Sequence, residues 1–251
     1  MKKFERKLKI KLTTNKKGQV KIKELAKAFN VTEETIRRDL KELHDEGLIK
    51  KVHGGAVCLE YNVEDTLDER FYMNTKAKEI IARKAIKHVR PYSRIYIDFG
   101  STTLAFSEEL SKIDNLEIFT NSPLLAKTAF EANSSHKVYI LGGLFLVQQH
   151  QNVGPITVNS IYDEFVDLAI TSPVAIDTKH GIFDIDQRKT EIAKAMIKNS
   201  RKCMVLADNS KLHKKGIWKT CSLAEIDYLV CDAKNDEINE ICRKYQIHYI
   251  F

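Results

Sequence analysis

Short apolar runs alternate with amphipathic stretches from about residue 75 to the end of the chain. We expect the apolar runs, which are rich in Ile, Val, Tyr and Phe, to form strands at Arg94–Asp98, Leu116–Thr120, Lys137–Leu141, Val166–Thr171, Cys203–Ala207, Tyr228–Cys231 and His248–Phe251. The stretches between them predict helices at Lys78–Val89, Thr102–Leu110, Leu124–Phe130, Thr157–Glu164, Thr190–Asn199 and Asp236–Tyr245. Strands and helices that alternate in this way predict an α/β domain, with a Rossmann-like parallel sheet and helices on both of its faces.

The first 57 residues follow another pattern, in which one short helix comes soon after another. The apolar positions of the first helix recur at helical spacing, at Ile22, Leu25, Ala26 and Phe29. Thr32 is a good N-cap for the second helix. The buried face of that helix is predicted at Ile36, Leu40 and Leu43. Two short helices joined by a tight turn are typical of a helix-turn-helix.

The outward face of the second helix is basic, which suits the major groove of DNA. Gly47 ends the helix, and Leu48–Val52 and Ala56–Cys58 predict two small strands joined by His53-Gly54-Gly55, which would form a wing. We expect the helix and the wing to contact DNA through Thr32, Thr35, Arg37, Arg38, Lys41, Lys50, Lys51 and His53. The alternative is a helical hairpin whose lysines are only solvated.

The distribution of charge separates this region from the rest of the chain. Residues 1–57 hold 16 Lys and Arg against 8 Asp and Glu, whereas the other 194 residues hold 25 against 26. The whole positive excess of the chain, +7, therefore lies in its first quarter. A basic module joined to a neutral body indicates a polyanionic partner for the module alone.

Composition excludes several classes of protein. No apolar run approaches the ~18 residues of a membrane span, and no apolar stretch follows the basic residues at the start. The five cysteines form no C-x-x-C pair, and the eight histidines show no metal-ligand spacing. We therefore expect a cytoplasmic protein with reduced thiols, no membrane partner, no metal and no cofactor.

Several predicted strands of the neutral body end in small, hydroxyl-rich or glycine-rich loops. Because the carboxyl ends of parallel strands form the binding crevice of such a sheet, these loops predict a ligand site. Backbone amides at a helix start, hydroxyl groups, a lysine and carboxylates suit a phosphorylated polyol. The residues expected to bind this effector are Asp98, Gly100, Ser101, Thr102, Thr103, Thr120, Asn121, Ser122, Gly142, Gly143, Asp208, Ser210 and Lys211.

The basic module contains T-E-E-T-I-R-R-D-L at 32–40, followed by K-K-V-H-G-G-A at 50–56. These literal residues resemble the DeoR family of bacterial transcriptional repressors. The resemblance implies a winged helix-turn-helix, with Thr35, Arg37 and Arg38 in the helix that contacts DNA. Asp39 is interpreted instead as a partner that orients a neighbouring arginine.

The resemblance to this family extends over roughly residues 75–232. It lies in D-F-G-S-T at 98–102, T-N-S at 120–122, V-G-P at 153–155 and L-A-D-N-S-K at 206–211. It implies a domain similar to ribose-5-phosphate isomerase that senses phosphorylated sugars. Where the family usually has a glycine-rich segment, this chain has T-S-P-V-A-I-D at 171–177, which leaves the identity of the effector open.

These observations predict a winged helix-turn-helix domain at 1–57, a connector at 58–74, and an effector-sensing and oligomerisation domain at 75–251. The leading hypothesis is a repressor of a sugar-metabolism operon that a phosphorylated sugar releases from operator DNA. We expect a homo-oligomer, a dimer or tetramer, because one short helix reads too few base pairs for specificity. The alternative is a phosphosugar isomerase or deaminase-like enzyme with a basic appendage, in which Asp98 or Glu191 would be the general base.

Overall fold

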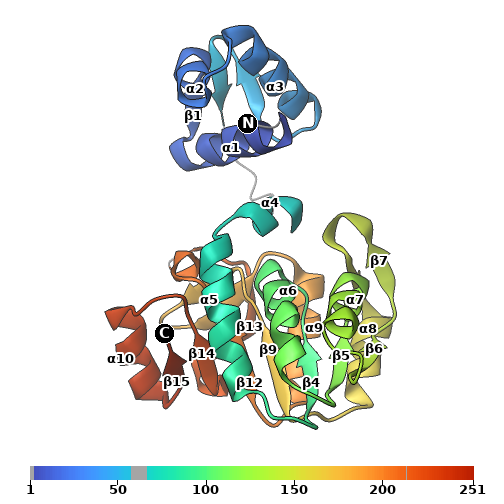
Figure 1. Ribbon diagram of the computed structural model, residues 1–251. Coiled ribbons are helices and arrows are strands. Elements are labelled where there is room, and N and C mark those ends of the chain that lie inside the picture. Colours follow the sequence, from blue (N-terminus) through green and yellow to red (C-terminus); the bar gives the residue numbers. More distant parts are fainter. Residues whose placement is uncertain (1–2, 58–66, 213) are drawn as a thin grey trace. The chain divides into compact units, whose positions relative to one another are not determined.

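The chain forms two compact units, Met1–Val63 and Glu64–Phe251 (Figure 1). The computed structural model describes residues 3–57, 67–212 and 214–251. The predicted connector, 58–74, lies outside the described residues as far as residue 66, as does Cys58, the expected end of a wing strand. Its second part contains helix α4 (Leu67–Tyr72).

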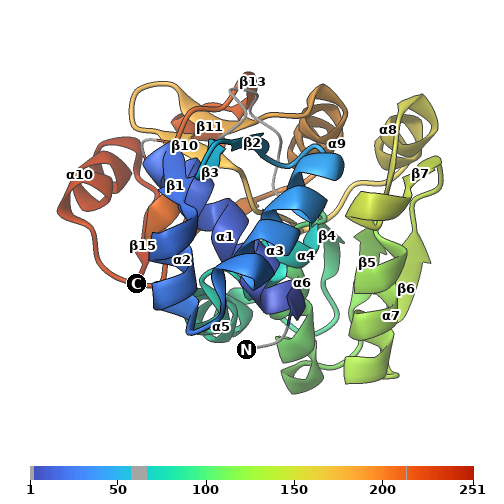
Figure 2. The same ribbon diagram turned by 90° about the horizontal axis from the view of Figure 1, so that it is seen from above.

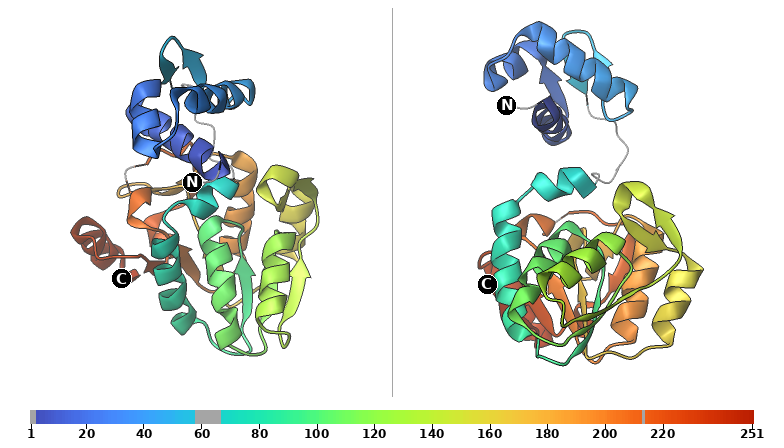
Figure 3. Two further views of the ribbon diagram at one scale, coloured as in Figure 1. Left: turned by 45° about the horizontal axis from the view of Figure 1, so that its top comes forward. Right: turned by 45° about the vertical axis from the view of Figure 1, so that its right-hand side comes forward.

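The N-terminal unit contains three helices and a small antiparallel sheet. The helices are α1 (Lys3–Lys17), α2 (Ile22–Phe29) and α3 (Glu33–Asp45). The strands are β1 (Gln19–Lys21), β2 (Lys50–Val52) and β3 (Gly55–Val57), in the order β1-β3-β2. Strands β2 and β3 form the predicted wing, which lies next to α3 (Figure 3).

The local signals that predicted α2 and α3 are confirmed. Asn30 takes the left-handed conformation (φ 52°) at the end of α2, and the Thr32 side chain accepts a hydrogen bond from the Thr35 amide at the start of α3. The expected apolar positions make up most of one core cluster, composed of Ile10, Val20, Ile22, Leu25, Ala26, Ile36, Leu40, Leu43, Ile49 and Ala56. Helix α1 and strand β1 were not predicted, although Ile10 and Val20 complete this core.

The C-terminal unit is built on a seven-stranded parallel sheet in the order β15-β14-β12-β9-β4-β5-β6. Its strands are β4 (Arg94–Ile97), β5 (Glu117–Thr120), β6 (Lys137–Ile140), β9 (Leu168–Thr171), β12 (Cys203–Leu206), β14 (Tyr228–Val230) and β15 (His248–Ile250). Each lies within or next to a predicted apolar run. The predicted α/β class and the parallel sheet are therefore confirmed.

Helices cover both faces of this sheet, as predicted (Figure 2). One face carries α5 (Thr75–Ala85), α6 (Ser101–Glu108) and α7 (Pro123–Ala132). The other carries α8 (Pro155–Tyr162) and α9 (Gln187–Lys198), while α10 (Asp236–Tyr245) packs on β15. Short 3-10 turns are η1 (Ile86–His88), η2 (Glu109–Lys112), η3 (Val147–Gln149), η4 (Asn209–Lys211) and η5 (Leu223–Glu225). Two apolar clusters fill the two sides of the sheet.

Two small antiparallel sheets beside the main one were not predicted. Strands β7 (Leu144–Leu146) and β8 (Gln151–Val153) form a hairpin after β6. Strands β10 (Ala175–Asp177), β11 (Gly181–Asp184) and β13 (Trp218–Cys221) form a three-stranded sheet after β9. Strands β8, β11 and β13 mix polar and apolar residues, so they lack the continuous apolar run that marked the strands of the main sheet.

Candidate functional site

The exposed side of α3 carries the cations predicted for it. Arg37, Arg38 and Lys41 are exposed, and the Arg38 side chain is 76% accessible. Ile36 and Leu40 are fully buried on the opposite side. The helix thus presents its guanidinium groups outward from a fixed core, as recognition of groove edges requires.

Glutamates in the first turn of α3 pair with these arginines. Arg37 Nη2 lies 3.2 Å from Glu33 Oε2, and Arg38 Nε lies 3.7 Å from Glu34 Oε1. Because both pairs are exposed, each contributes less than about 1 kcal/mol to stability. The pairs orient the arginines without burying them, which leaves their charges available to phosphates or bases.

The wing places three further predicted residues at the surface. Lys50, Lys51 and His53 are exposed on β2 and the turn that follows it. Gly54 has φ 79°, which favours glycine, and a Cβ on Gly55 would lie 2.0 Å from the Val20 carbonyl oxygen. The two glycines are therefore needed for the turn and for the close approach of β3 to β1.

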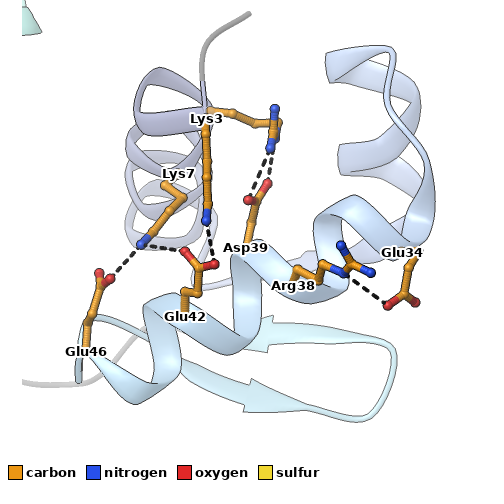
Figure 4. A network of polar contacts seen from close by, with 8 residues as sticks. Lys3, Lys7, Glu34, Arg38, Asp39, Glu42 and Glu46 are labelled. Carbon is orange, nitrogen blue, oxygen red and sulfur yellow. Dashed lines mark hydrogen bonds and ion pairs between the residues drawn. The ribbon is translucent and has the colours of Figure 1, made fainter.

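Asp39 is buried, and its partner is an arginine, as expected. Its carboxylate accepts two hydrogen bonds from Arg6 of α1, with Arg6 Nε 2.5 Å from Oδ2 and Nη2 3.2 Å from Oδ1. The two arginines next to Asp39 in the sequence, Arg37 and Arg38, are exposed instead. The Asp39 carboxylate raises the pKa of Arg6 through this hydrogen bond. Asp39 thus holds α3 against α1 (Figure 4).

Two more lysines of α1 reinforce that contact. Lys7 Nζ lies 2.6 Å from Glu46 and 3.2 Å from Glu42, and Lys3 Nζ lies 2.6 Å from Glu42 (Figure 4). These α1 lysines neutralise the acidic C-terminal half of α3. No local pattern in the sequence indicates this role, since the pairs span more than 30 residues.

A second group of cations lies in the C-terminal unit, where Lys78 is buried and Lys211 is partly buried. Lys78 of α5 is 5% exposed, and its Nζ donates to the carbonyl oxygens of Arg70 and, at 2.6 Å, Met73. Burial, with nearby Lys211, lowers the pKa of Lys78 to about 8. Burial, with Lys214, likewise lowers the pKa of Lys211 to about 8. Each of these lysines therefore loses its proton more readily than an exposed lysine.

A cavity of about 500 Å³ is lined by residues that neighbour Lys78 and Lys211 in the sequence, although neither lysine lines it. Its lining combines the first turn of α5 with the loops after β12 and β14, at Asn74, Thr75, Lys76, Ala77, Asp208, Ser210 and Asp232. Asn74 Nδ2 donates to Asp208 Oδ1 at 3.3 Å and to Ser210 Oγ at 3.2 Å. The N-cap side chain of α5 makes no capping bond, so the first amides of the helix face the cavity region without that acceptor. Asp208, Ser210 and Lys211 were predicted, whereas Asn74 and Lys78 were missed.

Asp98 directly follows β4 and is buried at 7% exposure. It accepts hydrogen bonds from the Phe99 amide at 2.8 Å and from Thr171 Oγ1 at 3.0 Å. Burial raises the pKa of Asp98 to about 7, and the charge of Asp184 adds to the rise. The charge of Asp184 also acts to raise the pKa of Lys211, against the larger effect of burial. The same carboxylate therefore acts on the loop after β4 and on the loop after β12.

Helix α6 begins shortly after Asp98 in the chain. Gly100 is its N-cap and makes no side-chain cap, and the next three residues, Ser101, Thr102 and Thr103, are buried. Thr103 Oγ1 donates to the Gly100 carbonyl at 3.0 Å. An N-terminus without a side-chain cap offers its amides to an anion.

The remaining predicted effector residues hold the β7–β8 hairpin and its surroundings. Ser122 caps α7 and donates to the His150 carbonyl at 2.7 Å, and Asn121 Nδ2 donates to the Asn152 carbonyl at 3.2 Å. Thr120 Oγ1 accepts from the Ser122 amide. Gly143, with φ 144°, would place a Cβ 2.1 Å from Thr157 Oγ1, and Thr157 donates to the carbonyl of Gly142. These residues have structural partners within the fold.

Strand order limits how many of the loops one small ligand reaches. The loop after β12 and the loop after β4 are separated by β9 alone, whereas β6 lies two strands further on. With about 4.8 Å between strands, β12 and β6 are roughly 19 Å apart. Strand order therefore places Thr120–Ser122, after β5, next to Asp98 and Gly100–Thr103, with Asp208–Lys211 two strands away on the other side. Gly142–Gly143, after β6, are the predicted residues furthest from the loop after β12.

Other predictions concerned catalysis, metals and membranes. Glu191, the second carboxylate considered as a general base, is exposed on α9, where it accepts a hydrogen bond from Gln187. Among the described residues, no three His, Cys, Asp or Glu side chains are grouped to hold a metal ion. No helix in the described ranges is long and apolar enough to cross a membrane.

Comparison with known proteins matches both units to one family. A family model of the DeoR-like helix-turn-helix domain matches residues 6–61, and one of the DeoR C terminal sensor domain matches residues 73–233. The chain also has a distant likeness to ribose 5-phosphate isomerase A of Methanocaldococcus jannaschii, with a TM-score of 0.40, 22% identity, and coverage of 57% of this chain and 56% of the isomerase.

Relatives similar over most of their length are named as regulators. The glycerol-3-phosphate regulon repressor of Escherichia coli is 31% identical over 216 residues, which cover 86% of this chain and 85% of that repressor. The transcriptional regulator GolR of Listeria innocua is 31% identical over 235 residues, which cover 92% and 91%. With both family domains present in order, the chain belongs to the DeoR family of transcriptional regulators.

Proposed function

We propose that this regulator is a repressor that binds operator DNA through α3 and the wing, and that a phosphorylated sugar releases it. The regions that contact DNA would be the exposed face of α3 with Thr32, Thr35, Arg37, Arg38 and Lys41, and the wing with Lys50, Lys51 and His53. The charge excess of residues 1–57 supports a polyanionic partner for this unit.

The observation that carries the effector proposal is the pair Lys78 and Lys211. Each ammonium group is held where burial lowers its pKa to about 8, and each feels the charge of Arg70. A phosphate dianion placed between them would remove the repulsion and replace the lost hydration. Amides at the starts of α5 and α6 would add neutral donors, and Asp98 and Asp208 would accept bonds from sugar hydroxyls.

The effector would also reach the segment that leads to the N-terminal unit. Arg70 belongs to α4, and Asn74 follows that helix closely. Both residues lie near the junction of the two units along the chain. A ligand that takes Asp208 or Ser210 as a partner competes with the Asn74 amide for both. Linkage then requires that DNA weaken effector binding by the same factor, about 5–150-fold for a coupling of 1–3 kcal/mol.

The proposal for DNA is tested by gel shift on the upstream region of the protein's own operon, with and without sugar phosphates. A shift that salt weakens steeply, and that one sugar phosphate reverses, is the expected result. If no fragment shifts at low salt, the protein does not work through α3 and the wing.

The proposal for the effector is tested by titration calorimetry of candidate sugar phosphates in two buffers of different ionisation enthalpy. Because a bound dianion raises the pKa of both lysines, binding near pH 8 should take up protons and affinity should fall as pH rises further. Near pH 6.5 both lysines are already charged, so their contribution to uptake should disappear. Binding with no proton uptake at pH 8 would place the ligand elsewhere.

We also propose that the chain acts without catalysis and as a homo-oligomer. The alternative enzyme needs a base poised beside a sugar carbon. Asp98 has a pKa suited to that task, but it lies in no recognisable acid/base motif, and Glu191 is exposed on the α9 surface. Isomerisation of a bound sugar phosphate, followed by proton exchange in NMR, would establish the enzyme instead.

A further inference from the structure

Strand β6 is the last strand of the main sheet, with β5 as its one partner among the described residues. The amides of Lys137 and Leu141 donate to Leu116 and Thr120 on the β5 side. Because amides alternate in direction along a strand, residues 138 and 140 turn their N–H and C=O groups toward the free edge. This edge therefore offers two donors and two acceptors in register.

The side chains at this edge are apolar and exposed. Tyr139 is 45% exposed and Ile140 is 51% exposed, on opposite faces of the strand. Natural edge strands are usually protected by charges, prolines or bulges. Here the single charged residue of β6, Lys137, is paired with Glu117 at 3.0 Å and protects neither Tyr139 nor Ile140.

Helices α7 and α8 lie on opposite faces of the sheet at its β6 end (Figures 1 and 2). In α7, Leu125 and Ala129 are buried, and Phe130 lies about a quarter turn away at 55% exposure. The right-handed β5–α7–β6 crossover turns that side of α7 toward the free edge. In α8, on the other face of the sheet, Thr157 and Ile161 are buried against the sheet and Ile156 is 70% exposed. We place Ile156 on the side of α8 that faces the free edge.

We propose that a second copy of this chain covers this edge, with the two β6 strands pairing antiparallel about a twofold axis at Tyr139. Val138 of each copy then exchanges both backbone hydrogen bonds with Ile140 of the other. The two Tyr139 residues face each other directly as a non-hydrogen-bonded pair. This inference deepens the proposal of a homo-oligomer by giving it a surface.

A second copy is favoured because the edge complements itself. The outward donors and acceptors of residues 138 and 140 match their own images only in the antiparallel arrangement, which is the arrangement that a twofold axis produces. In that arrangement the β7–β8 hairpin of one copy, with exposed Leu144 and Phe145, lies at the end of the sheet where α7 of the other copy carries Phe130.

The area also fits a dimer. Phe130, Tyr139, Ile140, Leu144, Phe145 and Ile156 are each about half exposed or more. Their accessible side chains amount to on the order of 500 Å², since a large side chain buries ~150–250 Å². The backbone edge and flanking atoms bring this near the roughly 800 Å² that each partner contributes to a standard interface.

The test is disulfide trapping of the full chain. Tyr139→Cys should form a disulfide-linked dimer under mild oxidation, because opposed residues in a non-hydrogen-bonded pair have Cα atoms about 4.5 Å apart. Ile140→Cys is the matched control. Position 140 faces Val138 of the other copy, so the two introduced cysteines would lie beyond the ~7 Å limit and should not crosslink. The parent protein, oxidised in parallel, shows whether the natural cysteines form a crosslink without the introduced one.

Ile140→Pro provides a second, independent measurement. It removes an amide that points to the free edge and leaves the β5 ladder intact, so the fold should persist while the dimer is lost by light scattering at micromolar concentration. Ile217→Lys, at an exposed position on the approach to β13, is the control and should leave the dimer unchanged. A monomeric parent protein, or crosslinking at residue 140 but not at 139, would overturn the proposal. Failure of operator binding with intact crosslinking would overturn only the proposed repressor function.

Discussion

The two units of this regulator present their positive charges in opposite ways. In the N-terminal unit Arg37, Arg38 and Lys41 are exposed, and the buried polar contact, Arg6 with Asp39, lies beneath them. In the C-terminal unit Lys78 is buried and Lys211 is partly buried, and burial lowers the pKa of each to about 8.

The difference follows from the size of the anion each surface suits. A DNA backbone is long and charged at every nucleotide, so a solvated, screened surface of cations is sufficient and makes affinity depend on salt. A small phosphate offers few contacts, so each must be strong, and strength comes from partly desolvated, charge-assisted hydrogen bonds. Substitutions in both units test this comparison.

The largest effect is expected from Arg6→Ala. It leaves the Asp39 carboxylate buried without its cation, which costs about 3–5 kcal/mol. Hydrogen exchange of α3 amides should accelerate, and operator affinity should fall although Arg6 is far from the α3 surface. Lys3→Ala, which removes an exposed pair with Glu42, should cost under ~1 kcal/mol. Equal effects of the two variants would show that burial of the pair is unimportant.

Lys211→Met is expected to abolish the response to the effector. Loss of a hydrogen bond to a charged group costs roughly 1.5–3 kcal/mol, or 10–100-fold in affinity. Operator binding should be unchanged in the gel shift, while calorimetry shows weak or absent effector binding. Lys215→Met, an exposed neighbour, is the control and should retain the response. If the Lys211→Met variant still responds to the effector, Lys211 does not belong to the effector site.

Asp98→Asn should stabilise the C-terminal unit above pH 7. Since burial raises the folded pKa of Asp98 to about 7, wild-type stability is lost as pH rises from the ordinary carboxyl range through 7. The variant should gain roughly 1–3 kcal/mol at pH 8 and nothing near pH 4. Unfolding followed by fluorescence of Trp218, the single tryptophan, measures the gain.

Asp177→Asn is the control for that experiment, because the backbone amides of Lys179 and His180 lower the pKa of Asp177. Its loss of charge should bring no gain at pH 8. A pH-independent gain in the Asp98 variant would mean that ionisation is not the cause.

The smallest effects separate base contacts from phosphate contacts. Arg38→Ala should cost roughly 1–3 kcal/mol on the operator and little on random DNA if Arg38 contacts a base. Lys51→Ala should weaken both and lower the log–log salt slope by about 0.9 if it contacts a phosphate. Fluorescence anisotropy at several salt concentrations distinguishes them. Identical salt slopes and losses in both variants would contradict the assignment of roles.

Local signals explain why much of the architecture was predictable. The apolar runs of β4, β5, β6, β9, β12, β14 and β15 lie along a parallel sheet with helices on both faces, which makes them continuous and visible. In α3, spacing alone identified Ile36, Leu40 and Leu43 as the buried face. The loops at the carboxyl edge followed from topology, because parallel strands all end on the same side.

The sequence by itself determined the two kinds of module, the order of the main elements and the family. Only the tertiary structure decided that Asp39 pairs with Arg6, that the charge of Lys211 acts on Lys78, and that Thr120–Ser122 support a hairpin. The physical reason is the separation along the chain between the groups that interact. Periodicity and capping act over a few residues, whereas these contacts join groups from 28 to more than 130 residues apart, and burial, which sets their energies, exists only once the chain has folded.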